Sequence, residues 1–263
     1  MQITNAQRKR YSRHLILNEV GLNGQEKISA AKVLVIGAGG LGSPALLYLA
    51  AAGVGTLGIA DGDEVDMSNL QRQVIHFTSD VARAKVESAA EKIARLNPHV
   101  RVKTHQARIT SDNIVALIET YDFIIDCTDN FAAKFLINDA CVLSAKPFSH
   151  AGVVQFVGQT MTVVPGLSAC YRCIFSEPPP PDTAPSSAQD GILGAVAGLF
   201  GTLQATEALK FIIDRGELLT DRIMIFDALE MKFRNVGIQP NPHCQVCGPQ
   251  PQITTLIDYE QTQ

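Results

Sequence analysis

The sequence is poor in charged side chains and has no excess of basic ones. Only 18% of its 263 residues are charged, and the formal net charge is −4. A nucleic-acid-binding protein normally carries a strongly basic surface, so this composition argues against nucleic acid as a partner. The chain also lacks the low hydrophobicity of a disordered protein, because 46% of its residues are apolar. We therefore predict an ordered protein with a sizeable core.

We also expect no secretory signal. Residues 1–13 are polar and lack the apolar core of a signal peptide. Residues 33–60 carry no charge over 28 positions, but seven glycines and Pro44 interrupt them, so a buried strand, turn, helix and strand explain them better than a membrane span. The uncharged run at residues 191–206 is too short to span. We expect a cytoplasmic protein with no membrane segment.

Apolar strands alternate with helices through the first half of the chain. This alternation predicts an open, mostly parallel α/β sheet over residues 30–150. After His150 the pattern favours antiparallel strands, followed by a proline-rich loop at residues 176–190. The predicted strands are residues 32–37, 56–60, 100–104, 122–126, 155–164 and 222–227, and the predicted helices are residues 5–17, 45–52, 80–96, 112–118 and 191–213.

A glycine pattern lies between the first predicted strand and the helix after it. Gly37, Gly39 and Gly42 match GxGxxG, and Asp61 lies 19 residues after Gly42. Glycines let phosphates approach the backbone and the helix N-terminus, and an acidic side chain at this distance can bind ribose hydroxyls. The pattern predicts a nucleotide site, with a tight turn that serves only packing as the alternative. It does not distinguish a dinucleotide from ATP.

Polar and cationic side chains follow Asp61. Residues 68–73 read Ser-Asn-Leu-Gln-Arg-Gln, and Lys85 comes soon after them. A hydride-transfer enzyme has no evident need for this set. A nucleotidyl transferase does, because charge develops on the α-phosphate and on the departing pyrophosphate. The alternative for each residue is a solvated surface side chain, and it is the stronger one for Lys85 taken alone.

A second polar group follows the predicted strand at residues 122–126. Asp129 is placed to bind magnesium or a nucleotide at the carboxyl end of that strand, with Asn130 behind it. The alternative is an N-cap for a helix that starts at Phe131. We expect Cys127 and Cys141 to be buried structural residues, because free cysteine is among the most buried residue types.

The other cysteines form two CxxC pairs, Cys170 with Cys173 and Cys244 with Cys247. Four thiolates satisfy tetrahedral zinc and leave no open position, so the two pairs together predict a structural zinc site. Either pair alone could be a redox motif or a chance occurrence. His243 adjoins Cys244 and could substitute as a ligand, although four cysteines make it unnecessary.

In their order and joint presence these motifs resemble the ubiquitin-activating-enzyme superfamily in its small bacterial form, the ThiF/MoeB/HesA family. The resemblance begins at Arg10-Tyr11-Ser12-Arg13, covers nearly the whole chain and is closest to the molybdopterin-synthase adenylyltransferase type. It implies a Rossmann-like α/β fold whose mostly parallel sheet continues into antiparallel strands, with a structural zinc site. It also implies one adenylation domain over residues 1–263. In that domain residues 1–150 are the nucleotide-binding half, and residues 151–263 are the carrier-binding half with the crossover loop and the zinc site.

The family uses Mg·ATP to adenylate the C-terminal glycine carboxylate of a small ubiquitin-fold sulfur-carrier protein, which ends in Gly-Gly, and releases pyrophosphate. A sulfur-donor protein then thiolates the acyl-adenylate. By this resemblance Asp61 holds the ribose, Asp129 coordinates magnesium, and Arg13 reaches the phosphates from the other subunit of a homodimer. Asn69, Arg72, Gln73 and Lys85 contact phosphates, and the remaining nucleotide-binding positions are Gly37, Gly39, Gly40, Gly42, Ser68 and Asn130. Since the carboxylate is itself the nucleophile, the enzyme needs only positioning and charge neutralisation.

One position departs from the family pattern. Thiamine-type members carry a cysteine in the crossover loop where this sequence has Ser187, and residues 174–243 contain no cysteine. We therefore expect the reaction to stop at the acyl-adenylate, with sulfur supplied by a separate protein. Two other hypotheses remain, an NAD-dependent oxidoreductase and a non-catalytic scaffold that docks the carrier. The sequence does not identify the carrier or its pathway.

Overall fold

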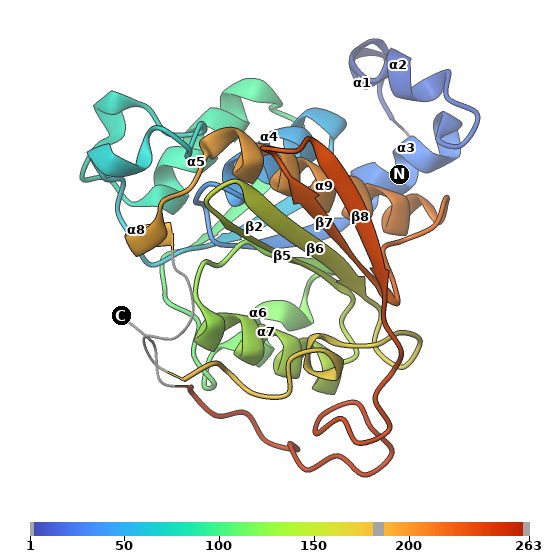
Figure 1. Cartoon of the computed structure of the whole chain (residues 1–263). Helices are drawn as coiled ribbons and strands as arrows, with labels where there is room; N and C mark the ends of the chain where they lie inside the picture. The colour runs from blue at the N-terminus through green and yellow to red at the C-terminus, as the bar shows by residue number, and fades with distance from the viewer. Residues whose placement is uncertain (1–2, 181–186, 260–263) are drawn as a thin grey trace.

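A mixed β-sheet runs through the centre of the molecule (Figure 1). The computed structural model describes residues 3–180 and 187–259, and within them eight strands pair in the order β3-β2-β1-β4-β5-β6-β7-β8. The strands are β1 (Lys32–Ile36), β2 (Thr56–Ala60), β3 (Arg101–His105), β4 (Phe123–Asp126), β5 (Phe148–Val154), β6 (Val157–Val163), β7 (Arg222–Asp227) and β8 (Lys232–Gly237).

The sheet changes from parallel to antiparallel at β5, which pairs in parallel with β4 and antiparallel with β6. This confirms the predicted α/β class with a mostly parallel sheet that continues into antiparallel strands. Two details of the prediction were wrong. The region predicted at residues 155–164 to form antiparallel strands contains β6 alone, which pairs with β5 just before it, and β8 was not predicted at all. Every residue of β8 is exposed, so no buried apolar face marks it in the sequence.

Helices cover both faces of the sheet (Figure 1). Side chains alternate along β1, so Val33 and Val35 pack toward one face and Leu34 and Ile36 toward the other. Because both faces are covered, the strand is continuously apolar. The first face carries α3 (Gly21–Ala30), α4 (Gly42–Ala52), α5 (Lys85–Leu96) and α9 (Gly194–Ile213), and the second carries α6 (Ile114–Glu119) and α7 (Phe131–Leu143).

Helix boundaries differ from the prediction where the chain turns. The single helix expected at residues 5–17 is two short helices, α1 (Asn5–Arg10) and α2 (Ser12–Leu15), and α3 was not predicted. The helix expected from residue 80 begins at Lys85, because Ala82 adopts a left-handed φ of 68°. The short remaining helices are η1 (Met67–Asn69), η2 (Thr78–Asp80), η3 (Tyr171–Cys173) and α8 (Ser187–Asp190). The predicted crossover loop therefore contains α8, and its residues 181–186 lie outside the described part of the chain, as does the Ser187 side chain.

Helix α9 is long and apolar enough, by length and composition alone, to cross a membrane. It packs against α4, β5 and β6, and its side chains Val196 and Phe200 belong to the core of that face. Gly201 permits the close approach to α4, because a Cβ there would lie 2.0 Å from the backbone oxygen of Leu41. The helix thus has the contacts of a core helix. It starts at Gly194, three residues after the predicted start.

Candidate active site

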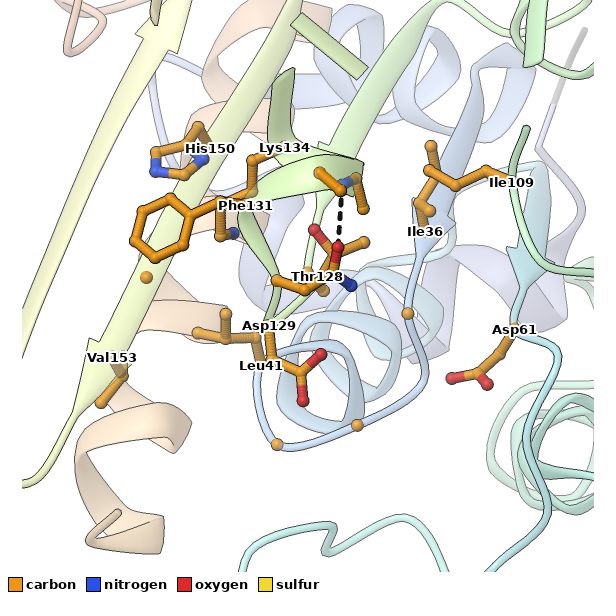
Figure 2. Close-up of a pocket in the computed structure, with 18 of the residues that line it drawn as sticks. Ile36, Leu41, Asp61, Ile109, Thr128, Asp129, Phe131, Lys134, His150 and Val153 are labelled. Carbon is orange, nitrogen blue, oxygen red and sulfur yellow. Dashed lines mark hydrogen bonds between the residues drawn. The ribbon is translucent and has the colours of Figure 1, made fainter. Parts of the chain in front are cut away.

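A cleft of about 720 Å³ opens at the carboxyl ends of the parallel strands (Figure 2). Its lining comes from the segments that follow β1, β2, β3 and β4, and from β5 itself. Strands β1 and β4 are neighbours, while β2 and β3 extend the sheet in the opposite direction. The chain therefore reverses its strand order at the cleft, which is where open α/β sheets bind ligands.

The glycine turn after β1 forms the floor of the cleft. Gly37 has a φ of 97°, and a Cβ there would lie 2.7 Å from the backbone oxygen of Cys127. Asp61 braces the turn, because its Oδ2 accepts a hydrogen bond from the backbone N–H of Ala38 at 2.8 Å. Of the four predicted glycines, Gly37, Gly39 and Gly40 line the cleft, whereas Gly42 lies against the backbone of Gly37.

Lys85 lines the cleft from the first turn of α5. Its side chain is only 8% exposed, and its Nζ lies 3.0 Å from Oδ2 of Asp63. The interpretation of Lys85 as a solvated surface residue is therefore wrong. Arg108 approaches the other carboxylate oxygen of Asp63 at 3.8 Å. Asp63 thus holds a buried ammonium at the edge of the cleft.

Arg72 and Gln73 also line the cleft. Arg72 donates from Nη1 to the backbone oxygen of Ser68 at 3.2 Å, and no carboxylate pairs with it in the described part of the chain. Gln73 is buried, and its Oε1 lacks a hydrogen-bond partner among the described residues. These two side chains bring a cation and an unsatisfied amide to the site.

Ser68 and Asn69 lie outside the lining, on η1. Ser68 donates from both its backbone N–H and its hydroxyl to Oδ1 of Asp66, and Asn69 donates from Nδ2 to the Ser68 hydroxyl at 3.4 Å. These contacts organise the loop that carries Arg72. Arg13 is exposed on α2 and does not line the cleft of its own chain either.

Asp129 and Asn130 follow β4 and both line the cleft. Figure 2 shows Asp129 and Asp61 on either side of the glycine turn. The Asp129 carboxylate is exposed and makes no hydrogen bond or ion pair with any residue that the structure describes. Asn130 accepts a hydrogen bond at Oδ1 from the backbone N–H of Ala133 at 2.8 Å, so it is the N-cap of α7. Asp129 thus presents a free carboxylate in the cleft, and carboxylate oxygens are the ligand type that hard cations prefer.

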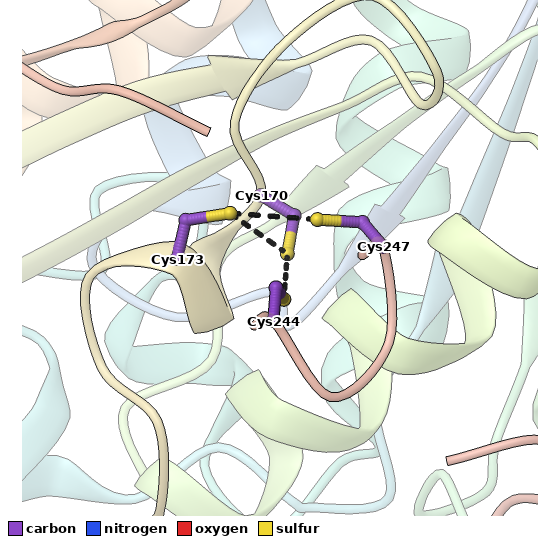
Figure 3. A group of neighbouring side chains, drawn as sticks. All are labelled: Cys170, Cys173, Cys244 and Cys247. Atoms are coloured by element: carbon purple, nitrogen blue, oxygen red, sulfur yellow. Dashed lines mark hydrogen bonds between the residues drawn. The ribbon is translucent and has the colours of Figure 1, made fainter. Parts of the chain in front are cut away.

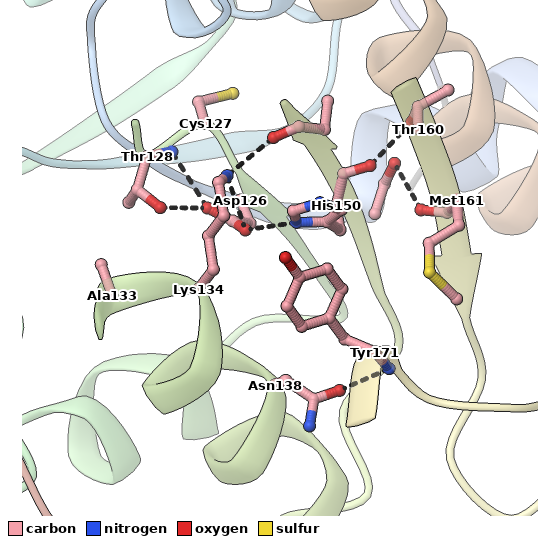
Figure 4. A network of polar contacts seen from close by, with 12 residues as sticks. Asp126, Cys127, Thr128, Ala133, Lys134, Asn138, His150, Thr160, Met161 and Tyr171 are labelled. Atoms are coloured by element: carbon pink, nitrogen blue, oxygen red, sulfur yellow. Dashed lines mark hydrogen bonds and ion pairs between the residues drawn. The ribbon is translucent and has the colours of Figure 1, made fainter. Parts of the chain in front are cut away.

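A buried polar network at the inner end of the cleft was missed by the sequence analysis (Figure 4). Asp126 accepts hydrogen bonds from Nδ1 of His150 at 2.9 Å and from the Thr128 hydroxyl at 2.6 Å, and it pairs with Lys134 at 3.4 Å. Lys134 and His150 line the cleft. A lysine within the otherwise apolar start of α7 was the available signal, since buried lysines are rare unless paired.

The four CxxC cysteines gather in one cluster (Figure 3). The sulfurs of Cys170 and Cys244 are 3.6 Å apart, those of Cys173 and Cys247 are 3.4 Å apart, and all four lie within 4.8 Å of one another. Tetrahedral ligands about 2.3 Å from zinc would be separated by about 3.8 Å, and disulfide sulfurs by about 2.0 Å. The cluster therefore could hold zinc and contains no disulfide.

His243, Cys127 and Cys141 lie outside the cysteine cluster. His243 is exposed and is not part of the cluster, so the four sulfurs form the donor set. Cys127 and Cys141 are buried, as predicted, and burial raises the pKa of both thiols well above the ordinary value. They have the environment of inert core residues.

Residues 11–246 match the ThiF family. The chain belongs to the ThiF family. Its relatives include the probable adenylyltransferase/sulfurtransferase MoeZ of Mycobacterium tuberculosis, 48% identical over 96% of this chain and 64% of that protein. Another is the adenylyltransferase and sulfurtransferase MOCS3 of Anopheles gambiae, 44% identical over 99% of this chain and 59% of that protein. The chain thus spans less than two thirds of these two relatives.

A third relative is similar along its whole length. The sulfur carrier protein adenylyltransferase of Thermus thermophilus is 43% identical over 99% of this chain and 98% of that protein. Among solved structures, E. coli MccB superposes with a TM-score of 0.82 at 25% identity, over 94% of this chain and 74% of that one. MccB with ATP superposes with a TM-score of 0.79 at 25% identity, over 90% of this chain and 74% of that one.

Proposed function

We propose that this member of the ThiF family is an ATP-dependent adenylyltransferase. Its second substrate is the C-terminal glycine carboxylate of a small ubiquitin-fold sulfur-carrier protein that ends in Gly-Gly. The names of the MoeZ, MOCS3 and Thermus relatives support this assignment. The structure of MccB with ATP supports ATP as the nucleotide. The observation that carries the proposal is that Arg72, Lys85 and Asp129 meet in one cleft with Asp61 and the glycine turn.

Each part of the cleft has a role in this reaction. Asp61 accepts hydrogen bonds from the ribose hydroxyls, and the backbone N–H groups of the glycine turn bind phosphate oxygens. A carboxylate oxygen of the carrier attacks the α-phosphorus, a new P–O bond forms, and the bond to the bridging oxygen breaks so that pyrophosphate leaves. Arg72 and Lys85 neutralise the charge that develops on these phosphates, and Gln73 donates from its amide nitrogen. Asp129 would hold a magnesium ion, which supplies further charge neutralisation when bound.

The donor set of the cysteine cluster fits a closed structural site, so the same proposal includes zinc held by Cys170, Cys173, Cys244 and Cys247. It also includes a homodimer in which Arg13 of one subunit serves the cleft of the other. We place the protein in the cytoplasm and expect the sulfur to come from a separate donor protein. Ser187, where thiamine-type relatives carry cysteine, supports a reaction that ends at the acyl-adenylate.

Pyrophosphate exchange tests the proposal directly. Purified protein with Mg·ATP and a Gly-Gly-ended carrier should exchange labelled pyrophosphate into ATP, and the carrier should gain the mass of one AMP. Arg72→Ala and Asp129→Ala should each reduce exchange by about 100-fold or more. Both side chains are at least partly exposed, so each substitution should change the free energy of unfolding by less than about 0.5 kcal/mol. Loss of folding in either variant would identify a structural residue instead.

Two rival functions give different results in the same experiments. An NAD-dependent oxidoreductase would bind NADH in preference to ATP and would tolerate Arg72→Ala. A non-catalytic scaffold would bind the carrier stably but would neither exchange pyrophosphate nor adenylate it. Absence of exchange with every Gly-Gly-ended carrier tested would contradict the adenylyltransferase.

A further inference from the structure

Residues 253–259, which we call the C-terminal strap, run from the cysteine cluster to the cleft. The strap begins where Ile253 donates its backbone N–H to the backbone oxygen of Gln245, between Cys244 and Cys247. Its apolar side chains Ile253, Leu256 and Tyr259 pack against the core that includes α6 and α7. The strap is therefore attached along its length and is not a loose end.

Asp258 fastens the strap to the loop between β3 and α6. Its Oδ1 accepts a hydrogen bond from the backbone N–H of Ser111 at 2.8 Å, and its Oδ2 accepts one from the Ser111 hydroxyl at 3.0 Å. These residues are 147 positions apart in the chain. Ile109 and Thr110, just before Ser111, line the cleft, and so do Asp258 and Tyr259. The clasp thus joins two segments that enclose the same space.

Tyr259 fastens the strap on the other side. Its hydroxyl donates to Oδ2 of Asp139 at 2.7 Å and accepts from Nη2 of Arg172 at 2.6 Å. Arg172 and Asp139 are themselves buried and paired through two hydrogen bonds of 2.7 and 3.0 Å. A buried, doubly bonded ion pair is a rigid support. Tyr259 is therefore fixed, whereas Asp258, which is exposed, can release Ser111.

The position of the strap indicates which part of a ligand it encloses. Strand β3 lies next to β2 in the sheet, and Asp61 follows β2 directly. The loop after β3, which Asp258 clasps, therefore stands on the ribose side of the cleft, beyond the glycine turn. A purine base attached to that ribose would meet the loop and the strap.

We propose that the C-terminal strap is a wall of the nucleotide site, and that the Asp258–Ser111 clasp slows the departure of the bound nucleoside. The identity of the nucleotide rests on the proposed function, but the wall does not. Opening the clasp exposes the base end of the site to solvent while the phosphate contacts of the glycine turn remain. The effect should therefore lie mainly in the dissociation rate.

Nucleotide binding to four variants tests the strap. The measurements are the Kd and dissociation rate of a fluorescent ATP analogue with wild type, Asp258→Ala, Ser111→Ala and the double variant. Thr255→Ala, an exposed position on the same strap, is the matched control. Asp258→Ala loses both hydrogen bonds and should weaken binding about three- to tenfold, and Ser111→Ala, which keeps its backbone N–H, should weaken it less. The double variant should match Asp258→Ala, since the two residues form one interaction.

The outcomes separate this proposal from the proposed function. The strap proposal is overturned if the Kd of Asp258→Ala for the nucleotide is within twofold of the values for wild type and Thr255→Ala, even when pyrophosphate exchange is intact. If wild type binds NADH and not ATP, the adenylyltransferase fails, and the same variants compared with NADH still decide the strap. A chain that binds neither nucleotide overturns both. Thermal unfolding of each variant shows whether a weaker affinity reflects damage to the fold.

Discussion

His150 donates from Nδ1 to a carboxylate oxygen of Asp126 at 2.9 Å, and neither residue is more than 1% exposed. Burial, helped by the Lys134 ammonium, holds the pKa of His150 below its ordinary value of about 6.5. Burial alone would raise the pKa of Asp126, but Lys134 and His150 hold it well below its ordinary range. The pair is therefore a carboxylate and a neutral imidazole near pH 7. Since Nδ1 carries the proton, Nε2 of His150 is an acceptor, and it has no partner among the described residues.

This pair should make the fold less stable in mild acid. Below about pH 6.5 the unfolded chain protonates His150 and the folded chain does not, so the free energy of unfolding falls by up to about 1.4 kcal/mol per pH unit. Asp126 adds a further loss below about pH 4, where only the unfolded chain is protonated. The free energy of unfolding, measured with urea at several pH values between 7 and 5.5, should depend less steeply on pH in His150→Asn than in wild type. This variant can still donate a hydrogen bond to Asp126.

His76 also contributes to the pH dependence of stability in that experiment. Burial also lowers the pKa of His76, so part of the slope remains in His150→Asn. Equal slopes in wild type and His150→Asn would mean that the folded chain binds a proton at His150 as readily as the unfolded one.

The glycine turn gives a second prediction through a matched pair of alanines. Gly37→Ala places a Cβ at a φ of 97° and 2.7 Å from the backbone oxygen of Cys127. Backbone strain alone should destabilise the fold by about 1–3 kcal/mol, and nucleotide binding should be lost with the turn. Gly152 also lines the cleft, yet a Cβ there meets nothing within 4 Å. Gly152→Ala should unfold like wild type, and equal melting temperatures for the two variants would contradict the argument.

Local patterns explain why some of this structure was predictable. Strand β1, the glycine turn and α4 are marked by an apolar run, a GxGxxG pattern and Ser43-Pro44, all within about twenty residues. The two CxxC pairs are equally explicit. In contrast, β8 has no buried face and exists because it pairs with β7. Helix α3 contains two glycines, which are poor helix formers, and its helical state depends on packing against α9.

The contacts in the site that escaped prediction all join distant segments. Asp126 meets His150 because β4 pairs with β5 in a register that places the two residues side by side. Lys85 is buried because Asp63, 22 positions earlier, lies beside it. Asp258 reaches Ser111 across most of the chain. Such contacts depend on strand pairing and chain path, which single-sequence patterns do not specify, whereas the residue types that bind a nucleotide can be recognised from spacing.

Zinc removal is the third prediction. Wild type should contain one zinc per chain, Cys244→Ser should contain almost none, and Cys141→Ala, which changes a buried cysteine outside the cluster, should keep it. Loss of the metal should lower Tm by more than about 5 °C, because the ion links the segment around Cys170 to the C-terminal region. Below the lowered Tm, the metal-free protein should still exchange pyrophosphate. An unchanged Tm in metal-free protein would contradict a structural zinc.

Arg13 supplies a fourth prediction, which depends on the proposed homodimer. It is exposed on α2 and lies outside the cleft of its own chain, so the proposal has it serve the reaction from a second subunit. Arg13→Ala and Arg72→Ala should each be inactive alone. In a mixed dimer the Arg13→Ala chain keeps its own Arg72 and receives Arg13 from its partner, which restores that cleft.

The other cleft of the mixed dimer lacks both arginines and stays inactive. Equal mixing after subunit exchange makes half of the dimers mixed, each with one working cleft, so activity should return to about one quarter of wild type. Arg8→Ala, at an exposed arginine on the neighbouring α1, should retain full activity by itself. No recovery on mixing, with subunit exchange verified by mass spectrometry, would place the action of Arg13 within its own chain or outside the reaction.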